Sequence, residues 1–474
     1  MQNDRPEFDS EIKAIADYAL SPLRISDMAL TTAYYTFIDS LACAYMALEH
    51  AACKQLLGPL VPGMTMDNGM SVPGCTEKLD PVQAAFNIGC LVRWLDFNDT
   101  WLAAEWGHPS DNLGCILSLC HYSIVHRGKK ITLRDVLAYM IKAHEIQGIL
   151  ALENSFNSVG LDHVILVKIA STAVGCSILG LNFEQTCSAL SQAWVDGQAL
   201  RTYRHAPNTG SRKSWAAGDA TARAIQLIFL TEKGEYGYPS VLSAKRWGFQ
   251  DVSFNSKSII RKQKYGCYVM ENILWKISFP AEFHAQTAAE CAIELHPQIK
   301  NRFHEIKEII IETQNAGATI IDKQGPLHNP ADRDHCIQYI CAIGFIHSEI
   351  KAVHYDEETA RDPLVDFLRS KMQVKEKTEF TKDYFDPNKR SIANSIQITF
   401  NDNTQTNKIT KHYPVGHRKR RKEGIPLLLQ KTQNAMKLTG IDEQIAHKYC
   451  DDDSHKNDGI LSASILEVLK DLKF

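Results

Sequence analysis

The chain has 474 residues, of which 44% are hydrophobic and 23% charged, as is ordinary for a globular protein. The formal net charge of −3 gives no overall attraction to nucleic acid or to an anionic membrane. No apolar run reaches the ~20 residues that span a bilayer, and at this length two domains are expected.

The chain begins with polar and acidic residues, unlike a secretory signal or an Arg-rich transit peptide, so the sequence predicts a cytoplasmic protein. Residues up to about 270 are predicted to be mainly helices rich in Ala and Leu. Thr132 is the expected N-cap of one helix, and residues 163–178 form another that ends near Gly180, with a new cap at Asn182. A compact helical bundle fits this pattern.

The pattern changes after residue 300. A β-branched run at 305–313 predicts a strand. Polar and apolar residues alternate over 395–400 and 404–412, on either side of the turn-forming segment Asn401-Asp-Asn403, and this pattern predicts a hairpin. Residues 460–472 have helical spacing. The sequence therefore predicts a mostly helical domain followed by a smaller mixed one.

The 13 cysteines are scattered along the chain without a Cys-x-x-Cys pair. This spacing argues against a disulfide framework and a zinc ribbon. Three distant cysteines could still hold an iron–sulfur cluster. The sequence contains neither of two glycine-rich nucleotide-binding patterns, Gly-x-x-x-x-Gly-Lys-Ser/Thr and Gly-x-Gly-x-x-Gly.

The segment from Arg93 to Asp111 places acids, a threonine and His108 between three tryptophans. Charged residues are seldom buried without partners, so this mixture predicts a partly dry polar pocket in which pKa values shift toward those useful for acid–base chemistry. The alternative is a helix end whose acids cap backbone N–H groups.

Eight further blocks, in order along the chain, carry a resemblance to a known family. They are Asp80-Pro-Val-Gln-Ala-Ala-Phe-Asn-Ile-Gly89, Lys142-Ala-His-Glu-Ile-Gln-Gly148, Trp194-Val-Asp-Gly197, Arg201-Thr-Tyr-Arg-His-Ala-Pro-Asn-Thr-Gly210, Lys213-Ser-Trp-Ala-Ala-Gly-Asp219, Lys276-Ile-Ser-Phe-Pro-Ala-Glu-Phe-His284, Asn329-Pro-Ala-Asp-Arg-Asp-His-Cys-Ile-Gln-Tyr339 and Tyr413-Pro-Val-Gly-His417. With the segment 93–111, they closely resemble the 2-methylcitrate dehydratase family, also called MmgE/PrpD.

The resemblance implies a mainly α fold: a large all-α domain (1–271), a smaller α+β lid (272–423) and C-terminal helices (424–474) that return to the large domain. It implies cofactor-independent dehydration of 2-methylcitrate to 2-methyl-cis-aconitate in propionate breakdown, with no metal, and a homodimer. The alternatives left open are a cis-aconitate decarboxylase or polycarboxylate isomerase of the same fold, and a non-catalytic tricarboxylate-binding protein.

Six positions match the family's active-site pattern and are the predicted catalytic residues: Asp96, Thr100, His108, His163, Lys213 and Tyr339. Removal of water from a hydroxy acid needs a base, an acid for the leaving hydroxyl, and cations for the carboxylates. We predict His108 or His163 as the base and Lys213 as a carboxylate ligand. Asp96 would orient a histidine or Lys213.

The same hypothesis has Thr100 and Tyr339 position the substrate or the leaving hydroxyl. Individually, each of the six could instead be an ordinary core residue. Two departures from the commonest pattern are Asn98, where many members have Asp, and Val164, where many have Pro.

Predicted substrate-binding residues are Arg201, Arg204, His205, Lys276 and His284. The first three belong to a basic, turn-rich loop, and Arg can form paired hydrogen bonds with a carboxylate; the alternative is a solvated loop. The basic run 417–422 fits nucleic-acid contacts less well than a solvated turn, because the whole chain is slightly acidic.

Overall fold

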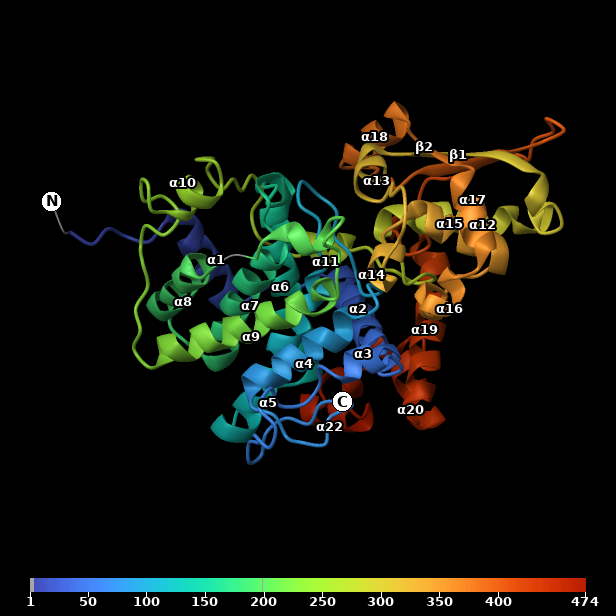
Figure 1. Cartoon of the computed structure of the whole chain (residues 1–474). Coiled ribbons are helices and arrows are strands. Elements are labelled where there is room, and N and C mark those ends of the chain that lie inside the picture. Colours follow the sequence, from blue (N-terminus) through green and yellow to red (C-terminus); the bar gives the residue numbers. More distant parts are fainter. Residues whose placement is uncertain (1–3, 198) are drawn as a thin grey trace.

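The computed structural model describes residues 4–197 and 199–474, and it confirms the predicted fold class: mainly helical, with one small sheet (Figure 1). The longer helices of the first part, which we call the helical unit, are α1 (Ser10–Leu20), α2 (Asp27–Ala47), α4 (Pro81–Arg93), α5 (Leu113–Arg127), α6 (Leu133–Glu153), α7 (Val164–Leu179), α8 (Phe183–Val195) and α9 (Arg212–Glu232). Shorter helices α3 (Ala51–Lys54), α10 (Phe249–Ser253) and α11 (Tyr268–Asn272) join them.

Helix α7 lies at the centre of the helical unit, and nearly all of its residues are buried. It ends at Gly180, whose φ of 81° lets the chain turn away, as the sequence predicts. The predicted caps at Thr132 and Asn182 are both present as reciprocal capping boxes. Local side-chain chemistry therefore sets where these helices begin and end.

Helices α4 and α9 cross at a pair of glycines. A Cβ on Gly89 would lie 2.5 Å from the Cα of Gly218, so the two backbones can touch only because neither position has a side chain. This close crossing brings the end of α4, with Arg93, near the start of α9, with Lys213.

The segment 272–423, which we call the lid, has its own apolar core, formed by side chains from residues between 279 and 400. Its sheet has the order β2-β1-β3-β4, with β1 (Ile306–Thr313) parallel to β2 (Met372–Glu376) and antiparallel to β3 (Asn394–Phe400), which pairs with β4 (Ile409–Lys411). Its helices are α12 (Gln286–Ile299), α13 (Asn315–Ile320), α14 (Pro330–Arg333), α15 (Ile337–His347), α16 (Glu357–Ala360), α17 (Pro363–Ser370) and α18 (Thr378–Phe385). Helices α12, α15 and α17 lie together on one side of the sheet (Figure 1).

The strands predicted at 305–313 and 395–400 are confirmed, and the hairpin is present, although β4 is shorter than the predicted 404–412. After the lid, α19 (Arg421–Leu438), α20 (Glu443–Cys450), α21 (Asp458–Leu461) and α22 (Ile465–Asp471) pack against the helical unit and share its core. The helix predicted over 460–472 is wrong as one element, because the chain breaks between α21 and α22.

The division into 1–271, 272–423 and 424–474 remains a proposal. Of the helices in the described residues, none is both long and apolar enough to cross a bilayer.

Candidate active site

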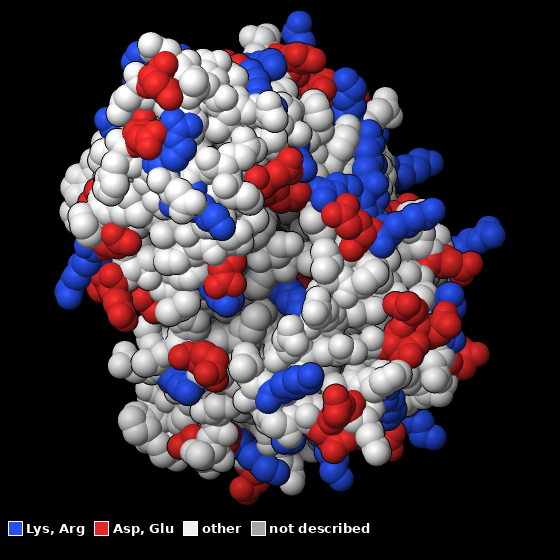
Figure 2. Space-filling view, turned by 90° about the vertical axis from the view of Figure 1, so that its right-hand side faces the viewer, with Lys and Arg blue, Asp and Glu red and all other residues white. Residues whose placement is uncertain are grey.

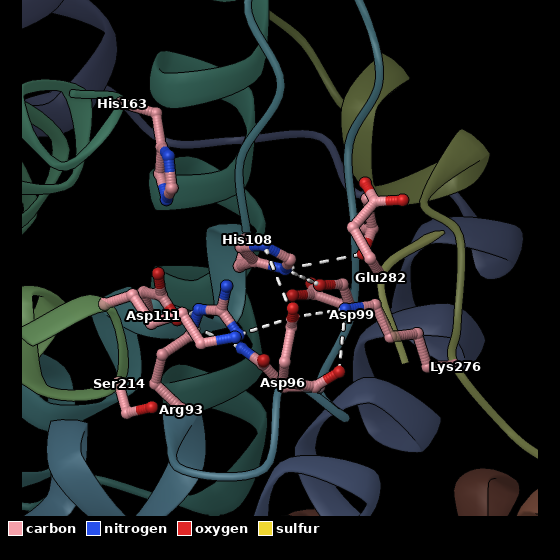
Figure 3. A network of polar contacts seen from close by, with 12 residues as sticks. Arg93, Asp96, Asp99, His108, Asp111, His163, Ser214, Lys276 and Glu282 are labelled. Carbon is pink, nitrogen blue, oxygen red and sulfur yellow. Dashed lines mark hydrogen bonds and ion pairs between the residues drawn. The ribbon is translucent and has the colours of Figure 1, made fainter. Parts of the chain in front are cut away.

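The floor of the candidate site is the loop that follows α4. Asp96 adopts a φ of 49°, a left-handed conformation that Asp tolerates better than most residues. Its carboxylate accepts a hydrogen bond of 2.5 Å from Arg93 Nη1 and another from Lys276 Nζ (Figure 3). Burial opposes its ionisation, but Arg93 and Lys276 outweigh burial and hold the pKa of Asp96 well below its usual range.

His108 follows a tight reversal in which Trp101 pairs with Gly107. Its Nδ1–H donates to the backbone carbonyl of Asp99 (2.6 Å), which leaves Nε2 as the free nitrogen, 3.8 Å from Asp96 Oδ1. Thr100 Oγ1 lies 3.4 Å from the same Nδ1. Burial lowers the pKa of His108 well below its usual value, and nearby cations lower it further, so the imidazole is neutral.

The loop that carries His108 is itself held from behind by a buried carboxylate. Asp99 Oδ1 accepts hydrogen bonds from the N–H and hydroxyl of Ser110 (3.0 and 2.6 Å), and its Oδ2 lies 2.8 Å from His144 Nε2. These contacts fix the carbonyl to which His108 donates.

His163 stands at the start of α7, facing the His108 ring at 5.6 Å between ring centroids. Within the described chain neither of its ring nitrogens has a hydrogen-bond partner, although the side chain is buried. Burial lowers its pKa well below the usual value. Its Nδ1 lies 3.4 Å from Asp162 Oδ1, beyond a good hydrogen bond. A buried imidazole without hydrogen bonds is costly unless a ligand supplies them.

Arg204 binds the neighbouring Asp162 with both Nε and Nη2, the latter at 3.1 Å. Arg201 Nη1 lies 3.6 Å from Asp162 Oδ2 and 3.9 Å from Glu105 Oε1, and it has no hydrogen-bond partner among the described residues. The guanidinium of Arg201 also lies over the Trp106 ring. One arginine is thus fully paired, while the other keeps a donor for a ligand.

Two residues of the lid, Glu282 and His335, also line the site. Lys213, from α9, donates to both oxygens of Asp334 (2.6 and 2.7 Å), and Asp334 Oδ1 accepts from His335 Nδ1 at 2.6 Å. This buried ion pair ties the lid to the helical unit. Burial lowers the pKa of Lys213, and Asp334 partly offsets the effect.

These groups enclose one cavity with a volume of about 30 Å³. Its lining residues are Arg93, Asp96, Thr100, Leu102, Trp106, His108, His163, Arg201, Arg204, His205, Lys276, Glu282, Phe283, Ile320 and His335. The volume suffices for a few waters, so a larger ligand requires its walls to move. The described residues include no group of three His, Cys, Asp or Glu side chains placed to hold a metal ion.

Eight of the eleven residues predicted from the sequence line this cavity, and three do not. Lys213 lines a separate cleft of about 610 Å³ between the helical unit and the lid. Tyr339 is in the lid core, where its hydroxyl donates to the His354 carbonyl (2.8 Å). His284 lies behind Glu282, with Nδ1 2.6 Å from Glu282 Oε1.

Sequence reasoning missed several residues of the site. Arg93 and Glu105 lie within the segment 93–111, Asp162 directly precedes the predicted His163, and His335 lies in the block 329–339, so their charge is a usable signal. Lys431 gave none. This buried lysine of α19 donates to the backbone carbonyls of Phe97 and Lys276 (2.9 and 2.8 Å), behind the cavity floor.

The basic run 417–422 is largely engaged within the structure. Arg420 pairs with Glu290 and Glu423, and the half-buried Arg421 lies over the Trp275 ring. On the face that Figure 2 shows, acidic and basic side chains are interspersed. Through the contacts of Arg420 and Arg421, the run mainly joins the lid to α19.

The chain belongs to the MmgE/PrpD family. The model of the MmgE/PrpD N-terminal domain matches residues 13–261, and that of the C-terminal domain matches residues 279–450.

Several curated relatives share over half of their aligned residues with this chain. It is 56% identical over 438 residues to a 2-methylcitrate dehydratase of Escherichia coli, covering 91% of both chains. It is 55% identical over 437 residues to a mitochondrial 2-methylcitrate dehydratase of Yarrowia lipolytica, covering 90% of this chain and 84% of the relative. A 2-methylcitrate dehydratase of Cupriavidus necator is 54% identical, with 90% of each chain covered.

Proposed function

We propose that this protein is a hydro-lyase that removes water from 2-methylcitrate to give 2-methyl-cis-aconitate, a step of propionate breakdown. The observation that carries the proposal is the lining of the cavity, where Arg201 Nη1 and both ring nitrogens of His163 lack hydrogen bonds within the described residues, beside the neutral His108. A tricarboxylate supplies both anionic acceptors and a hydroxyl to such groups. High identity to curated dehydratases over most of the chain supports the same reaction.

The geometry supports His108 as the base. Its Nδ1–H is fixed by the Asp99 carbonyl, so the lone pair of Nε2 faces the cavity. It would take the proton from the carbon next to a carboxylate, and the electron pair would form the new double bond as the hydroxyl leaves. Arg201 and Lys276 would stabilise the negative charge that develops on that carboxylate.

The remaining predicted residues take positioning roles in this proposal. Asp96 orients Lys276 by its ion pair and faces His108 Nε2, and Thr100 stands beside the His108 ring. Lys213 acts through Asp334 on the lid. Tyr339 and His284 support the lid from within, through the His354 carbonyl and Glu282 respectively.

The test is an absorbance assay at the conjugated double bond of the product. Chelator-treated protein is given 2-methylcitrate, citrate or cis-aconitate, and CO₂ release is followed in parallel. We expect the fastest rise with 2-methylcitrate, unaffected by the chelator and without CO₂. Release of CO₂ from cis-aconitate would place the protein among decarboxylases, and thermal stabilisation by citrate without turnover would make it a binding protein.

The His108→Ala variant probes the base directly. We expect kcat to fall by ~10²–10⁴-fold, the usual contribution of a placed proton-transfer group, with little change in melting temperature. Near-normal turnover in this variant would remove His108 from the mechanism. The cytoplasmic location and a homodimer remain predictions, to be checked by fractionation and by light scattering.

A further inference from the structure

Of the four histidines that line the reaction cavity, His108, His163 and His335 differ in what holds Nδ1. His108 donates to a backbone carbonyl; His163 Nδ1 lies 3.4 Å from Asp162 Oδ1 but makes no hydrogen bond within the described residues. His335 alone of these three is hydrogen-bonded through Nδ1 to a carboxylate, that of Asp334 at 2.6 Å. A carboxylate on Nδ1 stabilises the imidazolium form, whereas a neutral carbonyl does so much less.

His335 also approaches the site from the opposite unit. It comes from the lid, directly before α15, while His108 belongs to the helical unit. Both Nε2 atoms face the same carboxylate: His335 lies 3.6 Å from Asp96 Oδ2, and His108 3.8 Å from Asp96 Oδ1. The two imidazoles therefore flank one space, which the substrate must enter.

We propose that His335 is the catalytic acid that protonates the leaving hydroxyl. The inference rests on the proposed dehydration. His108 Nε2 takes the proton from the carbon next to a carboxylate, and the C–H electron pair becomes the C=C bond. The C–O bond breaks, its pair stays on oxygen, and that oxygen takes the Nε2 proton of His335 and departs as water. After product release, His108 loses its extra proton to solvent and His335 regains one.

The charges around His335 explain how it acquires its proton. It faces Lys213 from α9 (3.0 Å from Nδ1), Asp96 from the loop after α4, and Asp334 and Glu282 from the lid. Burial and then Lys213 lower the pKa of the His335 imidazole, and Asp334 and Asp96 oppose them. A bound trianion adds negative charge beside the ring and raises that pKa, so that binding favours the protonated form.

The experiment compares two leaving groups in His335→Gln and His108→Gln. The substrates are 2-methylcitrate and its analogue with fluorine in place of the hydroxyl. Fluoride is a far weaker base than hydroxide and needs little help from an acid. We expect H335Q to lower kcat by ~10²–10⁴-fold for the hydroxyl substrate and much less for the fluoride, whereas H108Q slows both.

The pH profile gives a second readout. An acid must be protonated, so wild-type kcat should fall as pH rises through the pKa of His335 in the complex, and this alkaline limb should be absent from H335Q. Asp334→Asn removes the carboxylate that raises this pKa and should shift the limb to lower pH. His347→Gln changes an exposed histidine at the end of α15 and is the matched control, with wild-type kcat and profile expected.

Wild-type kcat in H335Q, an equal loss with both substrates, or an unchanged alkaline limb would each overturn the assignment. If the fluoride substrate is inert even with wild type, the alkaline limb decides. Melting temperatures of H335Q and H347Q separate loss of chemistry from loss of fold. Failure of wild type to dehydrate 2-methylcitrate is a different result, because it overturns the proposed function itself.

Discussion

Replacing Lys431 tests whether the C-terminal helices serve the active site or only the core. Its Nζ lies 2.8 Å from Asp39 Oδ1, and it donates to the carbonyls of Phe97 and Lys276. Those two carbonyls belong to the segments that carry the ion pair between Asp96 and Lys276. Lys431 thus fastens both halves of the cavity floor to α2 and α19.

The Lys431→Met variant should lose ~3–5 kcal/mol of stability at pH 7, because removing one partner leaves the other charge buried and unpaired. Burial already raises the pKa of Asp39 to about 6 with the lysine present. Without Lys431 this pKa rises further, so folding at pH 7 would require Asp39 to take up a proton. Asp39→Asn in the same chain removes that charge.

Comparison of the single and double variants separates stability from positioning. In D39N/K431M most of the melting temperature should return, while kcat stays at least ~10-fold low, since displacement of reacting groups by about 1 Å can cost ~10²-fold. Melting curves and kcat with 2-methylcitrate are measured side by side. If kcat recovers together with the melting temperature, Lys431 is a structural residue only and the positioning argument fails.

Two further predictions concern binding and the floor of the site. Burial raises the pKa of Glu105 to about 7, so its carboxyl is neutral at pH 6 and ionised at pH 8, when it competes with substrate for Arg201, 3.9 Å away. KM should therefore rise from pH 6 to 8 in wild type and stay flat in Glu105→Gln; parallel profiles would contradict this. A Cβ on Gly416 would lie 1.7 Å from the Trp275 carbonyl oxygen, so Gly416→Ala should cost ~1–3 kcal/mol or more and lower kcat by shifting the adjoining Lys276. An unchanged melting curve would refute that steric argument.

The elements that the sequence predicts well are those set by local chemistry. The caps at Thr132 and Asn182 and the stop at Gly180 depend on side chains within a few residues of the helix end. The break between α21 and α22 was missed, because the apolar spacing of 460–472 continues across it. There, Leu133 N–H donates to the Ala463 carbonyl and Ile465 N–H to the Ile131 carbonyl, contacts that sequence spacing does not contain.

The residues of the candidate site also differ in whether the local sequence predicts them. A segment rich in acids and tryptophans identifies Asp96 and His108, since such residues are seldom buried without a reason. Lys431 sits in an ordinary polar helix, and only the return of α19 to the helical unit shows which carbonyls it binds. Residues that act through backbone groups of distant segments carry no local signal.

The proposed acid, His335, is linked to the contact between the lid and the helical unit. Asp334 holds Nδ1 of His335, whose Nε2 lies 3.6 Å from Asp96, and Asp334 is itself held by Lys213 of the helical unit. We expect this contact to loosen when substrate enters and to form again around it. In the proposed mechanism His335 would then reach its place as the site closes, where less bulk solvent surrounds the developing negative charge. On this proposal, closure and the approach of His335 to the site of His108 occur together, and Asp334 couples them.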